Sequence, residues 1–194
     1  MSARRLVLAS GSPWRRALLE RLRLPFDWQA PETDEAVRVG ETPRARAERL
    51  ARTKAMAVRE RFPTAWLIGS DQVAVCDGKL LGKPGSPEGA QRQLETASGR
   101  CVHFLTAVCL TDAASGTTQA HVDETTVHMR ALAPEQIERY VRLDQPCDCA
   151  GGFRAEALGI ALFERIESSD PTALIGLPLI WLSGALSRIG FDIP

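Results

Sequence analysis

The sequence lacks any excess of charge of one sign and any long apolar run. Lys and Arg total 24, and Asp and Glu also total 24, so the overall charge does not favour nucleic acid or an anionic membrane as a partner. No stretch approaches the roughly 18 consecutive apolar residues of a membrane-spanning helix, and the opening MSARRLVLAS lacks the apolar core of a signal peptide. We therefore expect a soluble cytoplasmic protein that binds neither nucleic acid nor membrane.

Cysteine and histidine are too few and too scattered for a disulfide framework or a zinc site. The five cysteines, at positions 76, 101, 109, 147 and 149, are an odd number in a chain large enough to build its own core. Cys147 and Cys149 are close in sequence, but no second ligand pair at zinc spacing follows them. The three histidines, at 103, 121 and 128, are expected to be surface residues of strands.

Common nucleotide-binding motifs are also missing. There is no GxxxxGK[ST] loop of an ordinary P-loop enzyme and no GxGxxG of a dinucleotide-binding fold. Internal repeats, low-complexity tracts and long linkers are absent as well. The 194 residues are therefore expected to form a single domain, residues 1–194.

Apolar runs alternate with helix-start signals along the chain, which predicts an α/β protein with a mixed sheet. Ser or Thr followed by Pro, Asp followed by Pro, or Pro alone predicts the helix starts. The first and last expected helices begin at 13 and at 170, and the helices between them cover 43–62, 86–97 and 134–142. The expected strands are 6–8, 66–75 and 159–166, together with a long hairpin of 101–111 and 117–129.

Residues 6–16, LVLASGSPWRR, combine a short apolar strand, a Ser/Gly turn and a helix start. Ser12 is placed to cap the free amides of the helix. Arg15 and Arg16 then add positive charge where the helix dipole is already positive, which costs ~0.3–1 kcal/mol for each residue unless an anion is present. Together with Ser10, this pattern favours a phosphate site. The alternative is a capped surface helix with solvated arginines.

Two carboxylates and two lysines elsewhere suit phosphate chemistry. Asp71 interrupts a core-like apolar segment, and a lone buried carboxylate is costly unless a cation, a metal or hydrogen-bond donors meet it. Lys54 borders the apolar side of its helix, Lys83 follows a predicted hairpin, and Glu35 ends an acidic run. Carboxylates and phosphate oxygens are the ligands that magnesium or manganese prefers. The set predicts metal-assisted hydrolysis of a nucleotide phosphoanhydride, with binding without hydrolysis as the alternative.

Several motifs together resemble the Maf family of nucleotide pyrophosphatases, over nearly the whole chain. They are LASGSPWRR at 8–16, TDE at 33–35, Lys54, IGSDQ at 68–72, GKP at 82–84 and DPTALIGLPL at 170–179. The resemblance implies an elongated α/β fold like that of inosine triphosphate pyrophosphatases, with two lobes around a cleft. It also implies a divalent cation, release of pyrophosphate from a nucleoside triphosphate, and a homodimer. By the same resemblance Asp71 is the proton acceptor, and the remaining polar cleft residues are Ser10, Arg15, Arg16, Glu35, Lys54 and Lys83. The metal ligands expected from carboxylate chemistry are Glu35 and Asp71.

Three further residues resemble one branch of this family. Trp14, Gln72 and Glu156 are similar to the branch that hydrolyses 7-methyl-GTP, whereas the dTTP/UTP branch has Arg, Thr and Gln there. The chemistry agrees, since an indole can stack on the cationic 7-methylguanine ring and a carboxylate can accept its N1 and N2 hydrogens. Without the resemblance, Trp14 could instead be a core residue and Glu156 an ordinary loop acid. A pyrophosphatase for other modified or pyrimidine triphosphates and a nucleotide-binding division regulator without turnover stay open as alternatives.

Overall fold

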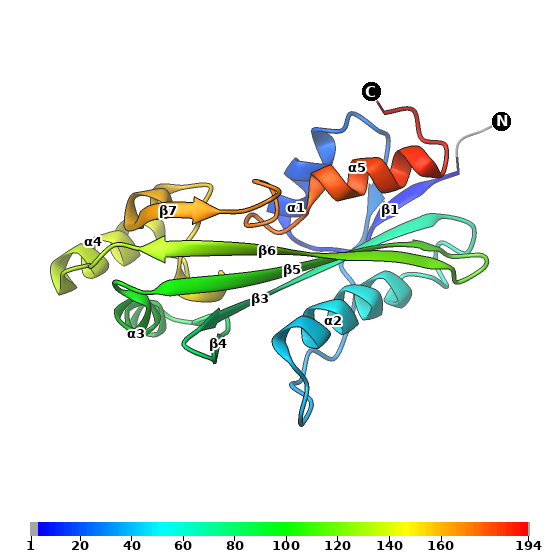
Figure 1. Cartoon of the computed structure of the whole chain (residues 1–194). Coiled ribbons are helices and arrows are strands. Elements are labelled where there is room, and N and C mark those ends of the chain that lie inside the picture. Colours follow the sequence, from blue (N-terminus) through cyan, green and yellow to red (C-terminus); the bar gives the residue numbers. More distant parts are fainter. Residues whose placement is uncertain (1–3, 194) are drawn as a thin grey trace. The chain divides into compact units, whose positions relative to one another are not determined.

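A computed structural model describes residues 4–193 and contains a mixed sheet with helices around it (Figure 1), which confirms the predicted α/β class. Within these residues the sheet has seven strands in the order β2-β1-β3-β5-β6-β7, with β4 paired to β3. Strand β1 is parallel to β2 and β3, while β4 and β7 are antiparallel to their neighbours. The strands are β1 (Leu6–Leu8), β2 (Asp27–Trp28), β3 (Trp66–Cys76), β4 (Lys79–Leu81), β5 (Cys101–Asp112), β6 (Thr118–Met129) and β7 (Phe163–Glu167).

The helices begin largely where the sequence signals place them. Three helix-capping side chains, those of Ser12, Thr42 and Ser86, each accept a hydrogen bond from a first-turn amide, and a proline follows each cap. The described α-helices are α1 (Pro13–Glu20), α2 (Pro43–Ala57), α3 (Pro87–Ala97), α4 (Pro134–Asp144) and α5 (Leu179–Arg188), with 3₁₀ turns at Ala150–Gly152 and Leu158–Leu162.

Three predicted element boundaries are wrong. Helix α2 ends at Ala57 and not at residue 62, because residues 58–62 form turns in which the Phe62 amide bonds to the Val58 and Arg59 carbonyls. The strand expected over 159–166 begins only at Phe163, since a 3₁₀ helix precedes it. The last helix begins at Leu179 rather than at 170, because residues 171–176 form hydrogen-bonded turns.

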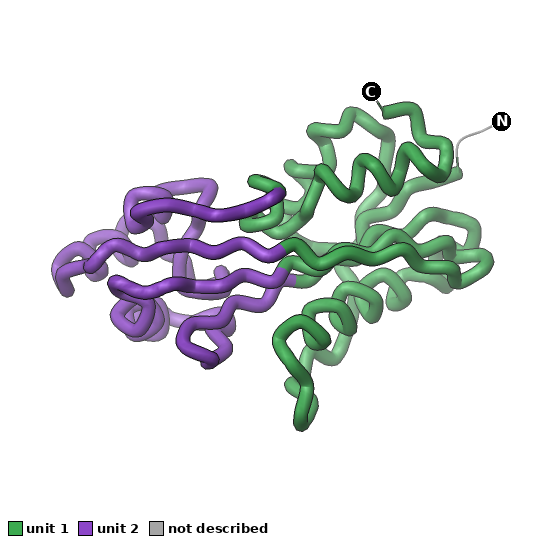
Figure 2. The backbone as a smooth tube through the Cα atoms, viewed as in Figure 1, with its two compact units in different colours: residues 1–71, 106–123, 170–194 green, residues 72–105, 124–169 purple. Residues whose placement is uncertain are grey.

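The chain divides into two compact units (Figure 2). Unit 1 comprises the described parts of residues 1–71, 106–123 and 170–194, and unit 2 comprises residues 72–105 and 124–169. Three of the four boundaries fall inside β3, β5 and β6, so each of these long strands contributes residues to both units.

The core of unit 1 joins the beginning of the chain to its end. Buried Leu6 and Leu8 of β1 pack in one cluster with Leu177, Leu182 and Leu186. Figure 1 shows α1 and α5 on one side of the unit 1 strands and α2 on the other. Helix α2 approaches β3 at Gly69, where an added Cβ would lie only 2.1 Å from the Ala51 carbonyl oxygen. Glycine is therefore required at this helix–strand contact.

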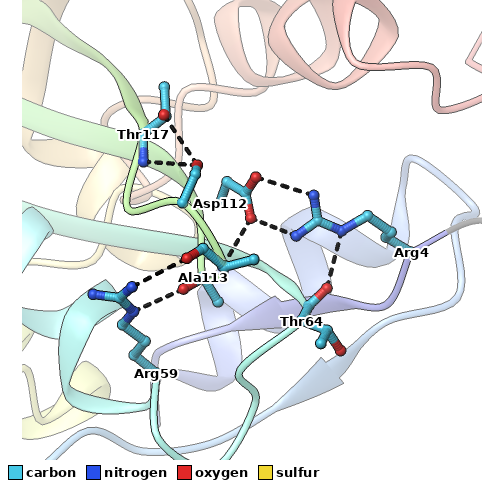
Figure 3. A network of polar contacts seen from close by, with 8 residues as sticks. Arg4, Arg59, Thr64, Asp112, Ala113 and Thr117 are labelled. Carbon is cyan, nitrogen blue, oxygen red and sulfur yellow. Dashed lines mark hydrogen bonds and ion pairs between the residues drawn. The ribbon is translucent and has the colours of Figure 1, made fainter.

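A polar network fixes the β5–β6 hairpin end of unit 1 (Figure 3). Arg4 forms a two-pronged ion pair with Asp112 and donates from Nε to the Thr64 carbonyl at 3.0 Å. Arg59 donates to the Ala113 carbonyl at 2.7 Å. These contacts link the hairpin turn to the start of the chain and to the segment after α2.

Unit 2 has its own aromatic core. Phe153 makes edge-to-face contacts with Phe104 and Phe163, with ring centroids 5.5 and 4.8 Å apart. The hydroxyl of Tyr140 in α4 accepts from the Arg154 amide at 3.0 Å and donates to Asp144 at 2.7 Å. Across the described chain, none of the helices is both long and apolar enough to span a membrane.

Candidate active site

The segment after β1 forms a capped helix start, as predicted. Ser10 is buried, and its Oγ accepts from the Ser12 amide at 3.1 Å. The Ser12 Oγ accepts in turn from the Arg15 amide at 3.4 Å. A strand, a serine-rich turn and a capped helix start therefore follow one another here, and helix starts of this kind bind phosphate groups in other proteins.

The two arginines of this turn have different partners. Arg15 donates from Nε to the Gly176 carbonyl at 2.8 Å. Burial lowers the pKa of Arg15, and the nearby charges of Asp71 and Glu35 oppose that decrease. The Arg16 guanidinium stacks on Trp28 of β2, with its central carbon 4.1 Å from the ring centroid. Stacking uses the face of the guanidinium and leaves its N–H edge suited to phosphate.

Lys54 lies between the two predicted metal-binding carboxylates. Its Nζ is 2.5 Å from Asp71 Oδ1 and 2.8 Å from Glu35 Oε1. Lys54 and Asp71 are only 9% and 7% exposed, whereas Glu35 is exposed. Asp71 is buried, and Lys54 supplies the cation, one of the three kinds of partner that a buried carboxylate needs. Lys54, predicted to border the apolar side of α2, is buried with that side.

The acidic loop is held by arginines that the sequence analysis did not single out. Arg46 donates to the Glu35 carbonyl at 2.9 Å, and Arg49 donates to the Ala36 carbonyl at 3.1 Å. Arg49 also forms a two-pronged ion pair with Glu41 at 2.5 and 2.7 Å. The spacing of Arg46 and Arg49, three residues apart on one helix face, was the available signal. These contacts place Glu35 beside Lys54.

The closing motif, residues 170–179, positions a backbone carbonyl at the same site. Asp170 is buried and accepts from the Thr172 amide at 2.8 Å and the Ile180 amide at 2.7 Å. The Thr172 hydroxyl lies 2.6 Å from Asp170 Oδ1 and accepts from the Leu179 amide at 2.9 Å. This folded-back segment presents the Gly176 carbonyl to Arg15 and to the Ser70 hydroxyl, each at 2.8 Å.

The structure brings part of the predicted set together within unit 1. Electrostatic contacts or ion pairs connect Arg15, Glu35, Lys54 and Asp71. Trp14, in the first turn of α1, is 38% exposed, so the alternative that it is a core residue is wrong. Three predicted residues belong to unit 2: Gln72, Lys83 and Glu156.

The unit 2 residues occupy different local settings. Gln72 is half-buried in β3 and directly follows Asp71. Lys83 is exposed in the loop after β4. Glu156 is exposed in the turn before the 3₁₀ segment Leu158–Leu162, and partial desolvation raises the pKa of its carboxyl group.

The carboxylate pair fits a divalent cation that also takes ligands from a substrate. Within residues 4–193, no group of three or more His, Cys, Asp or Glu side chains is arranged to hold a metal ion. Magnesium commonly uses one or two protein carboxylates and completes its shell with phosphate oxygens and water. Glu35 and Asp71 match this requirement, because both carboxylates lie within 2.8 Å of the same Lys54 nitrogen and are therefore close to each other.

Comparison with known proteins gives one consistent result. A family described as Maf-like protein matches residues 5–189. A protein of Xanthomonas campestris pv. campestris named 7-methyl-GTP pyrophosphatase is 54% identical over 190 residues, which is 98% of both chains. Proteins of the same name from Alcanivorax borkumensis and Pseudomonas aeruginosa are 49% and 50% identical over 189 residues, covering 97% of this chain and 96% and 98% of theirs.

Proposed function

This chain belongs to the Maf family, and we propose that it hydrolyses 7-methyl-GTP to 7-methyl-GMP and pyrophosphate. Relatives named for this activity share 49 to 54% of their residues with it over nearly the full length of both chains. The structural observation that carries the proposal is the buried ion pair of Asp71 and Lys54 beside Glu35. A carboxylate and a cation fixed together in this way suit proton transfer and phosphate binding at one place.

In the proposed reaction, Asp71 accepts a proton from the water that attacks the α-phosphorus. A bond forms between the water oxygen and this phosphorus, and the bond from the phosphorus to the pyrophosphate oxygen breaks. Lys54 holds the Asp71 carboxylate in place at 2.5 Å. Arg15, anchored by the Gly176 carbonyl, presents its remaining N–H groups for the negative charge that develops on the leaving pyrophosphate.

A divalent cation, magnesium or manganese, would supply further charge neutralisation on the phosphates when bound. Glu35 and Asp71 are the residues proposed to hold it, because their oxygens are hard ligands on neighbouring elements. Ser10, Arg16 and Lys83 are proposed to bind the phosphates through hydrogen bonds and charge.

Substrate selection is proposed to depend on Trp14, Gln72 and Glu156. The exposed indole of Trp14 is free to stack on a cationic purine, which is worth about 0.5–2 kcal/mol. Glu156 would accept the N1 and N2 hydrogens of the base, and a mismatched buried hydrogen-bonding group costs about 1–3 kcal/mol. Since about 1.4 kcal/mol is a factor of ten, we expect at least tenfold selectivity for 7-methyl-GTP over GTP and pyrimidine triphosphates.

We also propose an overall architecture and an oligomeric state. From the resemblance of its motifs to the Maf family, we propose the elongated, two-lobed architecture of inosine triphosphate pyrophosphatases and assembly as a homodimer. On this proposal Gln72, Lys83 and Glu156 contact the same nucleotide as the unit 1 cluster.

The direct test is a pyrophosphate-release assay over 7-methyl-GTP, GTP, dTTP and UTP with magnesium or manganese. We expect the highest kcat/KM with 7-methyl-GTP and no turnover in chelator. Equal hydrolysis of dTTP would contradict the substrate assignment and leave a pyrophosphatase of the other branch. Tight nucleotide binding without turnover of any triphosphate would favour the regulator instead.

The combined variant Trp14→Arg, Gln72→Thr and Glu156→Gln tests the selectivity residues together, because residues that share one ligand are seldom additive. We expect its kcat/KM to fall for 7-methyl-GTP and to rise for dTTP or UTP, with an unchanged metal requirement. If the variant keeps the wild-type preference, these residues do not select the base.

A further inference from the structure

A cysteine, a histidine and a glutamate lie in line across three adjacent strands of unit 2. The Sγ of Cys101 in β5 is 3.3 Å from the Nδ1 of His128 in β6. The Nε2 of His128 is 3.2 Å from the Oε1 of Glu167 in β7. The imidazole therefore contacts a thiol with one nitrogen and a carboxylate with the other, which is the order of groups that activates a nucleophilic thiol.

The imidazole is placed to take the thiol proton. Its Nε2 is shielded from solvent and has no hydrogen-bond partner among residues 4–193. The negative charge of the Glu167 carboxylate, 3.2 Å away, therefore offsets the cost of burying this nitrogen. Transfer of the Cys101 proton to Nδ1 gives an imidazolium, and Glu167 attracts that charge. The thiolate is the reactive form of cysteine, and an adjacent imidazolium stabilises it.

The thiol is also accessible. Cys101 and His128 are half-buried and Glu167 is exposed, while the next residue in β5, Val102, is buried on the other face of the sheet. Arg165 is the cross-strand partner of His128 and is exposed, and its guanidinium forms an ion pair with the same Glu167 oxygen that faces the imidazole.

The other cysteines are in less reactive settings. Burial raises the pKa of Cys76 and raises the pKa of Cys109 and of Cys149 to about 11. Cys147 is half-buried like Cys101, but the three histidines are occupied elsewhere: His103 with Thr126, His121 with Trp181 and His128 with Cys101. Cys147 is therefore the matched comparison thiol for Cys101.

We propose that Cys101 is a modification site that reacts with small disulfides. His128 accepts the Cys101 proton, and the thiolate attacks one sulfur of the disulfide. A new bond forms between Sγ and that sulfur, the original disulfide bond breaks, and the leaving thiolate takes the proton from His128. Cys101 ends as a mixed disulfide and the reagent is reduced to one thiol, so the exchange needs no further oxidant.

The test uses the full-length protein and glutathione disulfide, with the modified cysteines located by mass spectrometry over time. We expect Cys101 to be modified at least about tenfold faster than Cys147, and no mixed disulfide at position 101 in Cys101→Ser. His128→Phe should slow modification of Cys101 by about tenfold or more, and Glu167→Gln should slow it less. His103→Phe, a change of the neighbouring histidine on the same strand face, is the matched control and should leave the rate unchanged.

Two results would overturn the proposal. One is modification of Cys147 as fast as that of Cys101 in the unaltered protein, and the other is an unchanged Cys101 rate in both His128→Phe and Glu167→Gln. Circular dichroism checks that each variant is folded, and the exposed Glu167→Gln decides the matter if His128→Phe does not fold.

Discussion

Lys54 and Asp71 are one interacting pair, so a change at either alters the surroundings of the other. Asp71→Asn keeps the size of the side chain and removes its charge. Under the proposed mechanism we expect kcat to fall by ~10²–10⁴-fold, the contribution of a positioned general base, or further if metal affinity is also lost. Nucleotide binding should stay measurable by calorimetry, because Arg15 is unchanged.

The matched control for Asp71→Asn is Glu48→Gln. Glu48 is exposed on the helix that carries Lys54, and its Oε1 is 4.0 Å from the Arg44 Nη1, so its charge contributes little. We expect this control to retain the wild-type rate. Near-normal kcat in Asp71→Asn would remove Asp71 from the mechanism.

At this scale the sequence could identify acids and cations by type, but not the backbone groups that hold them. Asp71 stood out because a carboxylate rarely interrupts an apolar run, and Lys54 because it bordered an apolar helix side. The Gly176 carbonyl that binds Arg15 could not be anticipated, since the two residues are 161 positions apart. The same holds for the loop carbonyls that bind Arg46 and Arg49.

Among the elements, the turn segment before α5 depends on one buried hydroxyl. Thr172→Val keeps the shape of the side chain but removes the hydroxyl that bonds to Asp170 and that accepts from the Leu179 amide. We expect a loss of about 2–3 kcal/mol in the free energy of unfolding, or roughly 5–10 °C in Tm. Activity should also fall, because the Gly176 carbonyl anchors Arg15.

Thr172→Ser is the matched control for this loss. It retains the hydroxyl and removes only a methyl group, so we expect a cost below about 1 kcal/mol. Calorimetric melting of both variants gives the comparison. If serine and valine destabilise equally, packing of the methyl group matters more than the hydrogen bonds.

The hairpin of β5 and β6 carries a pH-dependent ion pair. The Arg4 guanidinium holds the pKa of the Asp112 carboxyl well below its usual range. When folding lowers the pKa of a carboxyl group, the group stabilises the folded state at pH values above its unfolded-state pKa of about 4. This stabilisation is lost as the pH falls through the lower pKa of the folded state. Because Arg4 is more than one third exposed, we expect Asp112→Asn to cost only about 1 kcal/mol at pH 7.

Urea denaturation of the wild type and Asp112→Asn between pH 7 and pH 2 measures this contribution. The difference in unfolding free energy should be constant above about pH 4 and should shrink below it. A difference that stays the same down to pH 2 would mean that Asp112 acts through its hairpin hydrogen bonds rather than through its charge.

The type of an element was predictable where the local sequence signals agreed. The predicted boundaries were wrong where contacts with distant residues determine where an element begins or ends. Serine, threonine and proline placed the starts of α1, α2 and α3, because capping is local. The Asp170–Pro171 pair looked like another such start. The Asp170 carboxylate instead binds the amides of Thr172 and Ile180, which delays the helix until after Pro178.

For the whole molecule, the aromatic residues allow the two units to be observed separately. All four tryptophans, at 14, 28, 66 and 181, lie in unit 1, and the one tyrosine, Tyr140, lies in unit 2. Because β3, β5 and β6 each contribute to both units, we expect the units to unfold together. Tryptophan fluorescence and far-ultraviolet circular dichroism should therefore give coincident urea transitions.

The same experiment tests the prediction that residues 1–194 form a single domain. The division into two compact units does not decide this, because it does not show whether either unit unfolds alone. A fluorescence transition that precedes the circular dichroism transition would show that unit 1 unfolds on its own. Composition and the absence of a linker supported one domain, but the sequence could not indicate that the chain crosses between units within its strands.

Unit 1 closes its core with a segment that is translated long after β1. Leu6 and Leu8 emerge early, yet Leu177, Leu182 and Leu186, which cover them, follow every other element of the described chain. At ~5–20 residues per second, the 161 positions between Arg15 and Gly176 take roughly 8–30 s to translate. During that interval the apolar side chains of β1 in the nascent chain stay exposed. We therefore expect that a chaperone that binds nascent chains can bind β1 during this time.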